Sequence, residues 1–389
     1  MRVTDYELFT VPPRWQFLKL ETADGTVGWG EPYTKWHTLE DSEPATTTAV
    51  DQLMTKYVLG ADPLAIEDCW QAMYERSFYR GGPVHMSAIA GIDEALWDIK
   101  GKHYGAPVYD LLGGRARDRI RLYQHVGGDD PGSLAASARA AVDDGYTAVK
   151  TSGGLPPHRQ VDAPAVVAEL RESVAAVREA VGPACDVAVD LHGKVQKPMA
   201  KRLVGAVEPQ ELLFVEEPVT PEYNEFLPDL AATTNTPIAT GERMYTRMDF
   251  KPLLESGGVD VVQPDVSHAG GITETRKIAA MADAYDVALA PHCPIGPLAL
   301  AASLHVDACS PNALLQEQIL FRGAQREDGW RSYLHNPEAL EPTDGYVDLP
   351  SGPGLGLDVD EEAVRERDGE DLNYTRGIER LPDGSVTGS

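Results

Sequence analysis

Charged side chains recur at a regular interval in the second half of the chain, each directly after a short apolar run. They are Asp190, Glu216, Glu242, Asp265, His292 and Glu317. Successive members are 26, 26, 23, 27 and 25 residues apart. An interval of this length holds one strand and one helix, so we expect these side chains to meet at the carboxyl edge of a parallel sheet.

Three carboxylates on consecutive predicted strands, Asp190, Glu216 and Glu242, form an oxygen-only set of possible metal ligands. Such a set suits a hard divalent cation such as Mg²⁺ and lacks the histidine or cysteine expected for zinc. Any one of them alone could belong to a structural ion pair. Three converging carboxylates repel one another unless a cation neutralises them, so we expect bound Mg²⁺.

Two histidines stand beside these acids. His292 ends the strand after the one that Asp265 ends, and a carboxylate can hold an imidazole in one tautomer and raise its basicity. This pair is a predicted general-base dyad. His192 follows Asp190 by two residues, so we expect it on the same strand face, pointing toward the metal from the opposite side as a second acid or base. A hydrogen-bonded core histidine is the alternative for each.

Lys150 and Glu317 complete the candidate site. Lys150 ends the second predicted strand, where its ammonium could neutralise a carboxylate substrate or the charge that develops on it. The alternative is a rim lysine whose charged end reaches solvent. Glu317 could hydrogen-bond the second carboxylate oxygen of a substrate if it is protonated, or if the developing enol carries the proton. Glu217 should face away from Glu216 and support the ligands.

Eight short apolar runs, separated by helical stretches, predict the elements that hold these residues. The runs are IRLYQHV, TAVKTS, DVAVDLH, LLFVEEP, PIATGE, VDVVQPD, DVALAPH and ALLQEQ. Strands alternating with helices imply a parallel sheet with right-handed crossovers, and eight such units close a barrel. We therefore expect an α/β fold with a modified TIM (β/α) barrel over residues 118–349.

The remaining segments predict a smaller domain and a tail. At about 150 residues per domain, 389 residues suggest two to three units. Residues 1–117 read as an α+β capping domain, with a hairpin around Asp24-Gly25 from Val11–Glu21 to Thr26–Glu31. A helix in MSAIAGIDEALWDIKGK should end at Gly101. Residues 350–389 should hold a last strand, SGPGLGLDVD, and a tail returning toward the capping domain.

Composition excludes several classes of function. The formal net charge of -27 repels phosphate polymers and anionic lipids, so neither nucleic-acid nor membrane-surface binding is expected. The chain shows no signal peptide or membrane span, and its four cysteines form no CxxC pair, which indicates a cytoplasmic protein. Lysine is scarcer than arginine, with 11 residues against 23. Together with the acidic excess, this composition resembles that of proteins from halophilic, salt-accumulating cytoplasms.

The sequence resembles the enolase superfamily, in its mandelate-racemase-like branch, and within it the sugar-acid dehydratases typified by D-galactonate dehydratase. The likeness runs through PPRWQFLKLET, GWGEP, FYRGGP, LLGG, DLHGKV, KPMAK, FVEEPV, IATGERM, QPDVSHAGGITE, ALAPHCPIGPLALAA and LQEQ. It implies a capping domain over a modified barrel and Mg²⁺ on Asp190, Glu216 and Glu242. It also implies a base dyad of Asp265 and His292, His192 as the acid, and Glu317 stabilising the intermediate.

The resemblance also implies a reaction. His292 would remove the C2 proton of a sugar acid, the metal would stabilise the enediolate, and His192 would protonate the departing 3-hydroxyl to leave a 2-keto-3-deoxy acid. Lys150-Thr151-Ser152 lacks the second lysine of the KxK pair common in racemases, and Ser267 rather than lysine follows Asp265 by two residues. Epimerase and cycloisomerase activities therefore lose support, while Ser152 departs from the amide more usual in galactonate dehydratases.

The expected substrate is D-galactonate, with D-gluconate next and a pentonate, xylonate or arabinonate, as the alternative. Arg14, Trp15, Tyr79 and Arg80 are capping-domain candidates for substrate contacts. A homo-oligomer is expected from the resemblance. A non-catalytic metal-binding barrel is the alternative from another class, but such a protein has no need for an acid and a base on opposite sides of its site.

Overall fold

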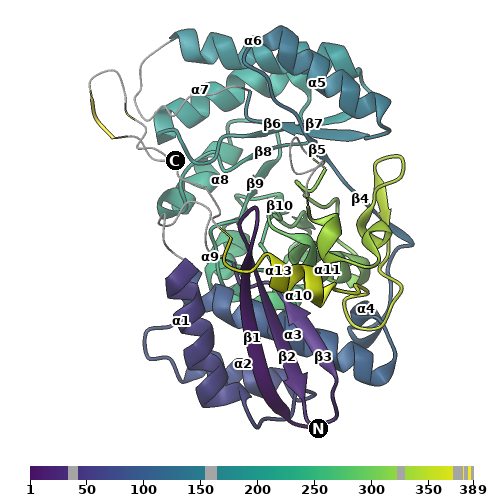
Figure 1. Ribbon diagram of the computed structural model, residues 1–389. Helices are drawn as coiled ribbons and strands as arrows, with labels where there is room; N and C mark the ends of the chain where they lie inside the picture. The colour runs from purple at the N-terminus through teal and green to yellow at the C-terminus, as the bar shows by residue number, and fades with distance from the viewer. Residues whose placement is uncertain (34–42, 154–163, 322–328, 371–379, 381–383, 387–389) are drawn as a thin grey trace.

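The computed structural model describes residues 1–33, 43–153, 164–321, 329–370, 380 and 384–386. The chain begins with an antiparallel three-stranded sheet (Figure 1) made of β1 (Val3–Val11), β2 (Trp15–Thr22) and β3 (Val27–Gly30). The predicted hairpin is β2 and β3, and Gly25 takes a φ of 81° in its turn. Val11 ends β1, which pairs with β2 along its whole length.

Helices cover this sheet and form the rest of the N-terminal domain. They are α1 (Glu43–Leu53), the π-helix η1 (Met54–Val58), α2 (Ile66–Glu75), α3 (Pro83–Tyr104) and α4 (Val108–Leu111). Helix α3 approaches β3 closely, because β3 carries glycine where the two elements meet. A Cβ on Gly30 would lie 2.0 Å from the carbonyl oxygen of Gly91.

The prediction that Gly101 ends the long helix is wrong. Helix α3 continues to Tyr104 and ends at Gly105, whose φ of 64° is left-handed. Gly101 is buried inside the helix, where a Cβ would lie 2.4 Å from the Cα of Gly354. Glycine serves here for the close approach of two backbones, a requirement that local sequence cannot show.

Replacing Gly101 by alanine is expected to destabilise the protein by about 2 kcal/mol, because the new methyl group meets backbone atoms that cannot give way. The matched control is Gly205→Ala in α7 (Lys197–Val207), where no described heavy atom lies within 4 Å of the new Cβ. That change should stabilise the helix by about 0.5–1 kcal/mol. Urea unfolding measures both, and equal midpoints for the two variants would contradict the packing at Gly101.

Seven parallel strands form the central sheet, in the order β11-β10-β9-β8-β7-β6-β5. They are β5 (Gln124–His125), β6 (Ala148–Thr151), β7 (Asp186–Asp190), β8 (Phe214–Glu216), β9 (Ile238–Thr240), β10 (Val261–Val262) and β11 (Ala288–Leu289). The eighth predicted run, ALLQEQ, lies between the two edges of this sheet. It is joined by parallel bridges from Ala313 to Leu289 on one side and from Gln316 to Leu122 on the other. The predicted α/β fold, a modified barrel with an N-terminal capping domain, is confirmed.

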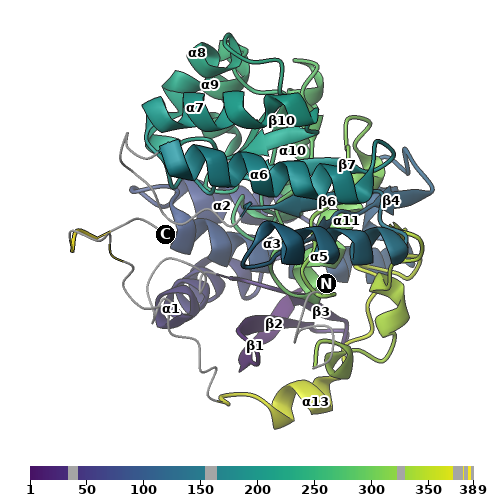
Figure 2. The same ribbon diagram turned by 90° about the horizontal axis from the view of Figure 1, so that it is seen from above.

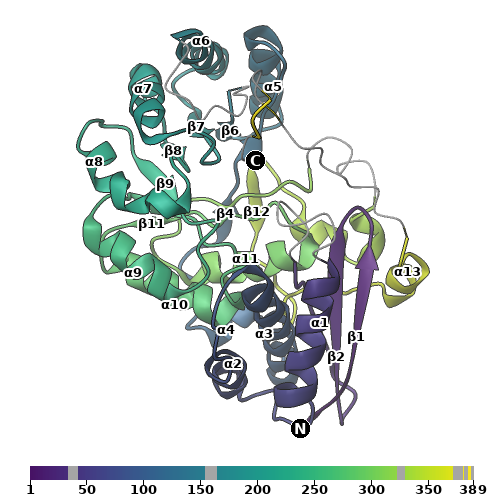
Figure 3. The same cartoon turned by 90° about the vertical axis from the view of Figure 1, so that its left-hand side faces the viewer.

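The first predicted strand, IRLYQHV, is divided between two sheets. Its start forms β4 (Arg119–Arg121), which pairs antiparallel with β12 (Tyr346–Asp348) near the end of the chain, as Figure 3 shows. Only Gln124–His125 joins the barrel sheet, beside β6. The apolar pattern indicates burial but not the partner of a strand, so one run can serve two sheets.

Helices cover the outer side of the barrel sheet (Figure 2) and connect its strands. In addition to α7 they are α5 (Pro131–Asp143), α6 (Pro164–Val181), α8 (Leu227–Ala231), α9 (Arg247–Ser256), α10 (Gly271–Asp283) and α11 (Pro297–Cys309). Short 3-10 turns lie at Glu208–Gln210, Pro221–Phe226, Arg331–Tyr333 and Pro337–Leu340. None of the described helices is long and apolar enough to cross a membrane.

The predicted last strand, SGPGLGLDVD, does not form. Residues 350–360 run as bends, with isolated bridges from Pro107 to Gly354 and from Leu334 to Val359. Gly354 and Gly356 take φ angles of 70° and 76°, which an extended strand does not accommodate.

The segment that follows returns to the N-terminal domain. Helix α13 (Glu361–Glu366) lies beside β1 (Figure 3), and Glu361 accepts a hydrogen bond from Lys19 Nζ at 2.8 Å. Arg365 Nη1 donates to Glu7 Oε2 at 2.8 Å. Most of the predicted tail, 371–379, 381–383 and 387–389, lies outside the described residues.

Candidate active site

Side chains alternate between the two faces of each strand, and this alternation points one row of polar residues toward the barrel interior. One buried apolar residue from each predicted strand fills the interior: Tyr123, Ala148, Ala188, Phe214, Ala239, Val261, Ala290 and Leu315. Residues two positions apart on a strand share a face. Polar side chains accordingly stand two residues beyond seven of these eight, at His125, Lys150, Asp190, Glu216, Gln263, His292 and Glu317.

The three predicted metal ligands converge. Asp190, Glu216 and Glu242 each offer a carboxylate oxygen, and these three oxygens lie within 4.8 Å of one another. Asp190 and Glu216 are buried and stand opposite each other in the register of β7 and β8. Burial raises the pKa of Glu216, and the negative charge of Asp190 adds to the effect. Glu216 Oε2 is buried without a hydrogen-bond partner among the described residues.

Lys150 lies among these acids and is not a snorkelling rim lysine. Its side chain is 2% exposed, and Nζ lies 2.6 Å from Glu216 Oε1, 3.0 Å from Glu317 Oε1 and 3.7 Å from Asp190 Oδ2. Burial opposes the charge, but attraction to Glu216 and Glu317 outweighs it and holds the pKa of Lys150 well above its ordinary value. The ammonium therefore offsets part of the repulsion within the acidic cluster.

His292 and Asp265 form the predicted pair. His292 Nδ1 lies 2.7 Å from Asp265 Oδ2, so Nε2 faces the acidic cluster, 3.3 Å from Glu242 Oε2 and 3.9 Å from Glu317 Oε2. Burial alone would lower the pKa of His292. The charges of Glu317 and Glu242 and the hydrogen bond to Asp265 outweigh burial and raise it to about 10.

His192 does not continue the strand face, which corrects that expectation. Strand β7 ends at Asp190, and His192 takes a left-handed φ of 50° in the turn that follows. Its ring nevertheless reaches the cluster, with Nε2 at 3.0 Å from Asp190 Oδ2. Burial works against the charged ring, but Asp190 raises the pKa of His192 above its ordinary value.

Glu317 is ionised and has a neighbour that sequence reasoning missed. Burial opposes its charge, yet Lys150 and His292 hold the pKa of Glu317 well below its ordinary value, so the protonated form considered above is disfavoured. Its Oε1 lies 2.7 Å from Nε2 of His125, at the end of β5. The signal was available: His125 precedes Lys150 by 25 residues, one strand and one helix.

Comparison with known proteins identifies the family. The family profile for "Mandelate racemase / muconate lactonizing enzyme, N-terminal domain" matches residues 13–113, and that for "Enolase C-terminal domain-like" matches residues 133–363. The second match covers more than half of the chain. The chain belongs to the mandelate racemase/muconate lactonizing enzyme family. The predicted place in the enolase superfamily is thereby confirmed.

Relatives in this family carry a specific name. The chain is 48% identical to D-galactonate dehydratase of Pectobacterium atrosepticum and 49% identical to that of Ralstonia pickettii, over 99% of each chain in both cases. A crystal structure of a mandelate racemase/muconate lactonizing enzyme from Sulfitobacter sp. has a TM-score of 0.89 at 32% identity, covering 98% of this chain and 99% of the other. This family member is a sugar-acid dehydratase, as predicted.

Two side chains support the carboxylate cluster of this dehydratase from behind. Glu217, fully buried with a φ of 45°, is hydrogen-bonded to Thr240 and Arg243 and accepts the Gly241 N–H at 3.2 Å. The Arg243 guanidinium also lies 3.4 Å from the His192 carbonyl oxygen. Glu217 thus faces away from the cluster and links the ends of β8 and β9, where two of the three converging acids stand.

Of the four capping-domain residues considered for substrate contacts, Arg14 lies near the dyad strand, and the other three lie in the core or on the surface. Trp15 packs in the core against Phe17 and Tyr333, and Tyr79 is 88% exposed. Arg80 pairs with Glu75 on the surface. Arg14 is buried and donates to the carbonyl oxygen of Pro294, two residues beyond His292, at 3.0 Å.

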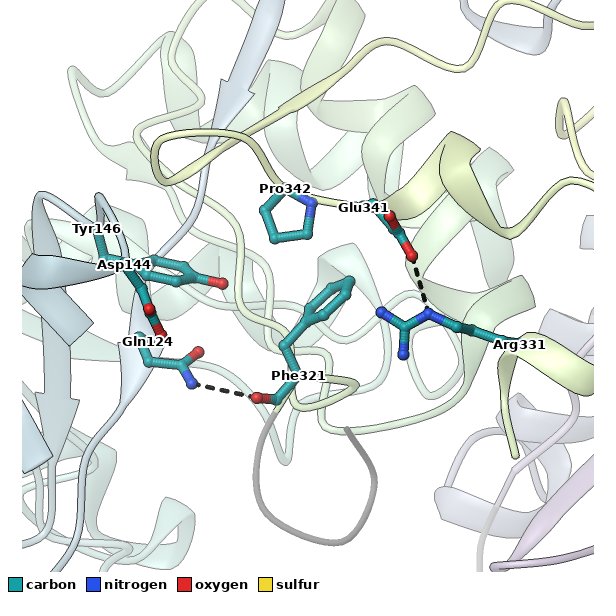
Figure 4. Close-up of a pocket in the computed structure, with 7 residues that line it drawn as sticks. All are labelled: Gln124, Asp144, Tyr146, Phe321, Arg331, Glu341 and Pro342. Carbon is teal, nitrogen blue, oxygen red and sulfur yellow. Dashed lines mark hydrogen bonds and ion pairs between the residues drawn. The ribbon is translucent and has the colours of Figure 1, made fainter. Parts of the chain in front are cut away.

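A cavity of about 210 Å³ lies outside the barrel interior (Figure 4). It is lined by Gln124, Asp144, Tyr146, Phe321, Arg331, Glu341 and Pro342. Gln124 precedes the inward-facing His125 and therefore points to the outer side of the sheet. None of the predicted site residues lines this cavity, so it is separate from the carboxylate cluster.

Proposed function

We propose that the protein dehydrates D-galactonate to a 2-keto-3-deoxy acid with the help of Mg²⁺. The convergence of Asp190, Glu216 and Glu242 beside two histidines carries the proposal. The identity of 48–49% to D-galactonate dehydratases over almost the whole chain supports the choice of substrate.

The residues fit a magnesium ion. All three converging donors are carboxylate oxygens, the preferred ligands of this cation. The buried, unpartnered Oε2 of Glu216 is an acceptor that a cation would satisfy. When bound, the ion would supply positive charge to the substrate carboxylate as the C2 proton leaves.

His292 is the proposed base. With Nδ1 bound to Asp265, Nε2 faces the cluster 3.3 Å from Glu242 Oε2, and the acids around it raise the pKa of His292. Positive charge bound at those acids would lower this pKa, and the neutral ring would then take the proton from C2. Asp265 holds the tautomer and stabilises the imidazolium that forms. Lys150 supplies a buried positive charge near the substrate carboxylate, where negative charge increases as the proton leaves.

His192 is the proposed acid. Its pKa is raised by Asp190, which favours the protonated ring needed to donate. The ring gives its proton to the 3-hydroxyl, the C3–O bond breaks, and water leaves as the C2–C3 double bond forms. The resulting enol tautomerises to the 2-keto-3-deoxy acid. Ionised Glu317, held by Lys150 and His125, is an acceptor for a hydroxyl proton on the substrate or enol.

A panel of aldonates tests the substrate. Purified protein with Mg²⁺ should release 2-keto-3-deoxy acid fastest from D-galactonate, and more slowly or not at all from D-gluconate, D-xylonate and D-arabinonate. A high concentration of KCl belongs in the buffer, because the net charge of -27 makes self-repulsion strong at low salt. A pentonate as the best substrate would overturn the choice of a hexonate, while no product from any aldonate by folded protein would overturn the dehydration.

The setting we propose for this reaction is the reducing cytoplasm. All four cysteines, Cys69, Cys185, Cys293 and Cys309, are buried free thiols. The salt-rich cytoplasm inferred from composition and the homo-oligomer inferred from the resemblance both stay predictions.

A further inference from the structure

Among the described barrel helices, α10 and α11 are the two that begin after a glycine N-cap, which has no side chain to cap them. Helix α10 follows Gly270 and α11 follows Gly296, and neither N-cap residue offers a side-chain acceptor to the first turn. Helix α5 in contrast provides its own cap, because Asp130 accepts two N–H groups at its start. Buried first-turn N–H groups need acceptors, so those of α10 and α11 require partners from elsewhere.

The acceptors come from the N-terminal domain. Glu31, directly after β3, accepts the Ala299 N–H in the first turn of α11 at 3.0 Å. Asp93, on α3, accepts the Thr273 N–H in the first turn of α10 at 3.0 Å. Both acids are fully buried. First-turn N–H groups need an acceptor, and a carboxyl oxygen provides one, so each acid is a cap supplied across the domain boundary.

The glycines at these helix starts match the incoming acids. A Cβ on Gly296 would lie 2.1 Å from Glu31 Oε1, and a Cβ on Gly271 would lie 2.4 Å from Asp93 Oδ2. Any side chain at either position would displace the carboxylate. The glycine at each helix start therefore leaves room for the acid from the N-terminal domain, and that acid replaces the local cap.

The two capped helices follow the strands that carry the dyad. Asp265 lies six residues before Gly271, and His292 lies four residues before Gly296. Short loops of this length transmit a shift of a helix to the residue at the strand end. Helix α3 lies against this part of the barrel, as Figures 1 and 3 show.

A third buried acid joins the two loops. Glu94, next to Asp93 on α3, accepts the Glu31 N–H at 2.7 Å and the Ser267 hydroxyl at 3.3 Å. The Ser267 N–H in turn donates to Asp265 Oδ1 at 2.8 Å. A continuous set of hydrogen bonds therefore runs from the cap of α11 to the dyad carboxylate.

We propose that Glu31 and Asp93 are positioning residues through which the N-terminal domain sets the geometry of the Asp265–His292 dyad. The proposal rests on the function proposed above for that dyad. Neither acid touches a reacting atom; each fixes a helix whose preceding loop carries one dyad member. The 2.7 Å contact between Asp265 and His292 depends on both loops.

An amide oxygen should replace either acid with little loss. Burial raises the pKa of Glu31 to about 8 and that of Asp93 to about 7, so the negative charge gains little at these positions. Each helix start requires a hydrogen-bond acceptor on a side chain long enough to reach its first-turn N–H group. Glutamine at 31 and asparagine at 93 keep an acceptor there, whereas alanine removes it.

The test measures kcat, KM and the exchange of the C2 proton of D-galactonate in D2O. Glu31→Ala and Asp93→Ala should lower kcat and C2 exchange by about 10- to 100-fold, because a displacement of about 1 Å costs about that much. KM should change by less than about 3-fold, since no contact to substrate is removed. Glu31→Gln and Asp93→Asn should restore most of the lost rate. Asp130→Ala removes a cap from α5 and should lower Tm while kcat stays unchanged.

Two results would overturn the inference: wild-type kcat in folded Glu31→Ala and Asp93→Ala proteins, or an equal loss in the alanine and amide variants. If the alanine variants do not fold, Glu31→Asp serves instead, since a shorter side chain breaks the contact with Ala299 without opening a large cavity. Wild-type kcat in Glu31→Asp would contradict the inference. Absence of 2-keto-3-deoxy acid product from the wild-type protein would instead contradict the proposed function itself.

Discussion

His292→Asn is expected to lower kcat by about 1,000-fold and to abolish exchange of the C2 proton of D-galactonate. Asparagine can occupy the space beside Asp265 but cannot accept a proton, and general-base catalysis contributes about 100- to 10,000-fold. Exchange into D2O, followed by NMR, measures proton abstraction separately from the loss of water.

His192→Asn should separate the two steps. Formation of the 2-keto-3-deoxy acid should fall by a similar factor, because the 3-hydroxyl leaves slowly without an acid. Exchange at C2 should persist, because His292 and Asp265 are intact. His335→Asn is the control: this histidine is largely exposed and pairs only weakly, at 3.6 Å, with Asp360. Unimpaired turnover in both site variants would contradict the roles proposed for these two histidines.

Mg²⁺ is expected to raise the Tm of the wild-type protein, and this shift should disappear in Glu216→Gln and Glu242→Gln. A ligand that binds only the folded state stabilises it by about 2.7 kcal/mol at a concentration of 100 times Kd. Each substitution removes one anionic ligand from a cluster whose oxygens lie within 4.8 Å of one another. Calorimetry with and without Mg²⁺ measures the shift, and turnover should fall below detection in both variants.

The control for this experiment is Glu225→Gln. Glu225 is an acid outside the barrel interior and pairs with Lys197 at 2.7 Å. Its variant should keep the full Mg²⁺-dependent rise in Tm. The same rise in all four proteins would show that magnesium acts elsewhere, as a general screen of the net charge of -27.

Lys150 offsets part of the repulsion within the carboxylate cluster. Its buried ammonium contacts Glu216 and Glu317 and lies 3.7 Å from Asp190, so part of the negative charge is paired within the barrel. A bound cation would share these acids with Lys150. The carboxylate of a substrate would then meet two positive charges, the metal and the ammonium.

The period of the strands determined much of the site from the sequence alone. Residues two beyond the buried interior residues had to face inward, because side chains alternate along a strand. The nearly equal spacing of Asp190, Glu216, Glu242, Asp265, His292 and Glu317 had to bring them to one end of the sheet, because parallel strands joined by helices end at the same edge. The same period extends back to His125, which the sequence analysis overlooked.

Only the tertiary structure decided which distant segments meet. Gly101 is glycine because Gly354 lies against it, and β4 leaves the barrel because β12 pairs with it. The caps of α10 and α11 come from Asp93 and Glu31, about 180 and 268 residues away in the chain. Local patterns record burial and helical or extended spacing. They do not record partners, because a partner far along the chain is selected by the packing of the whole fold.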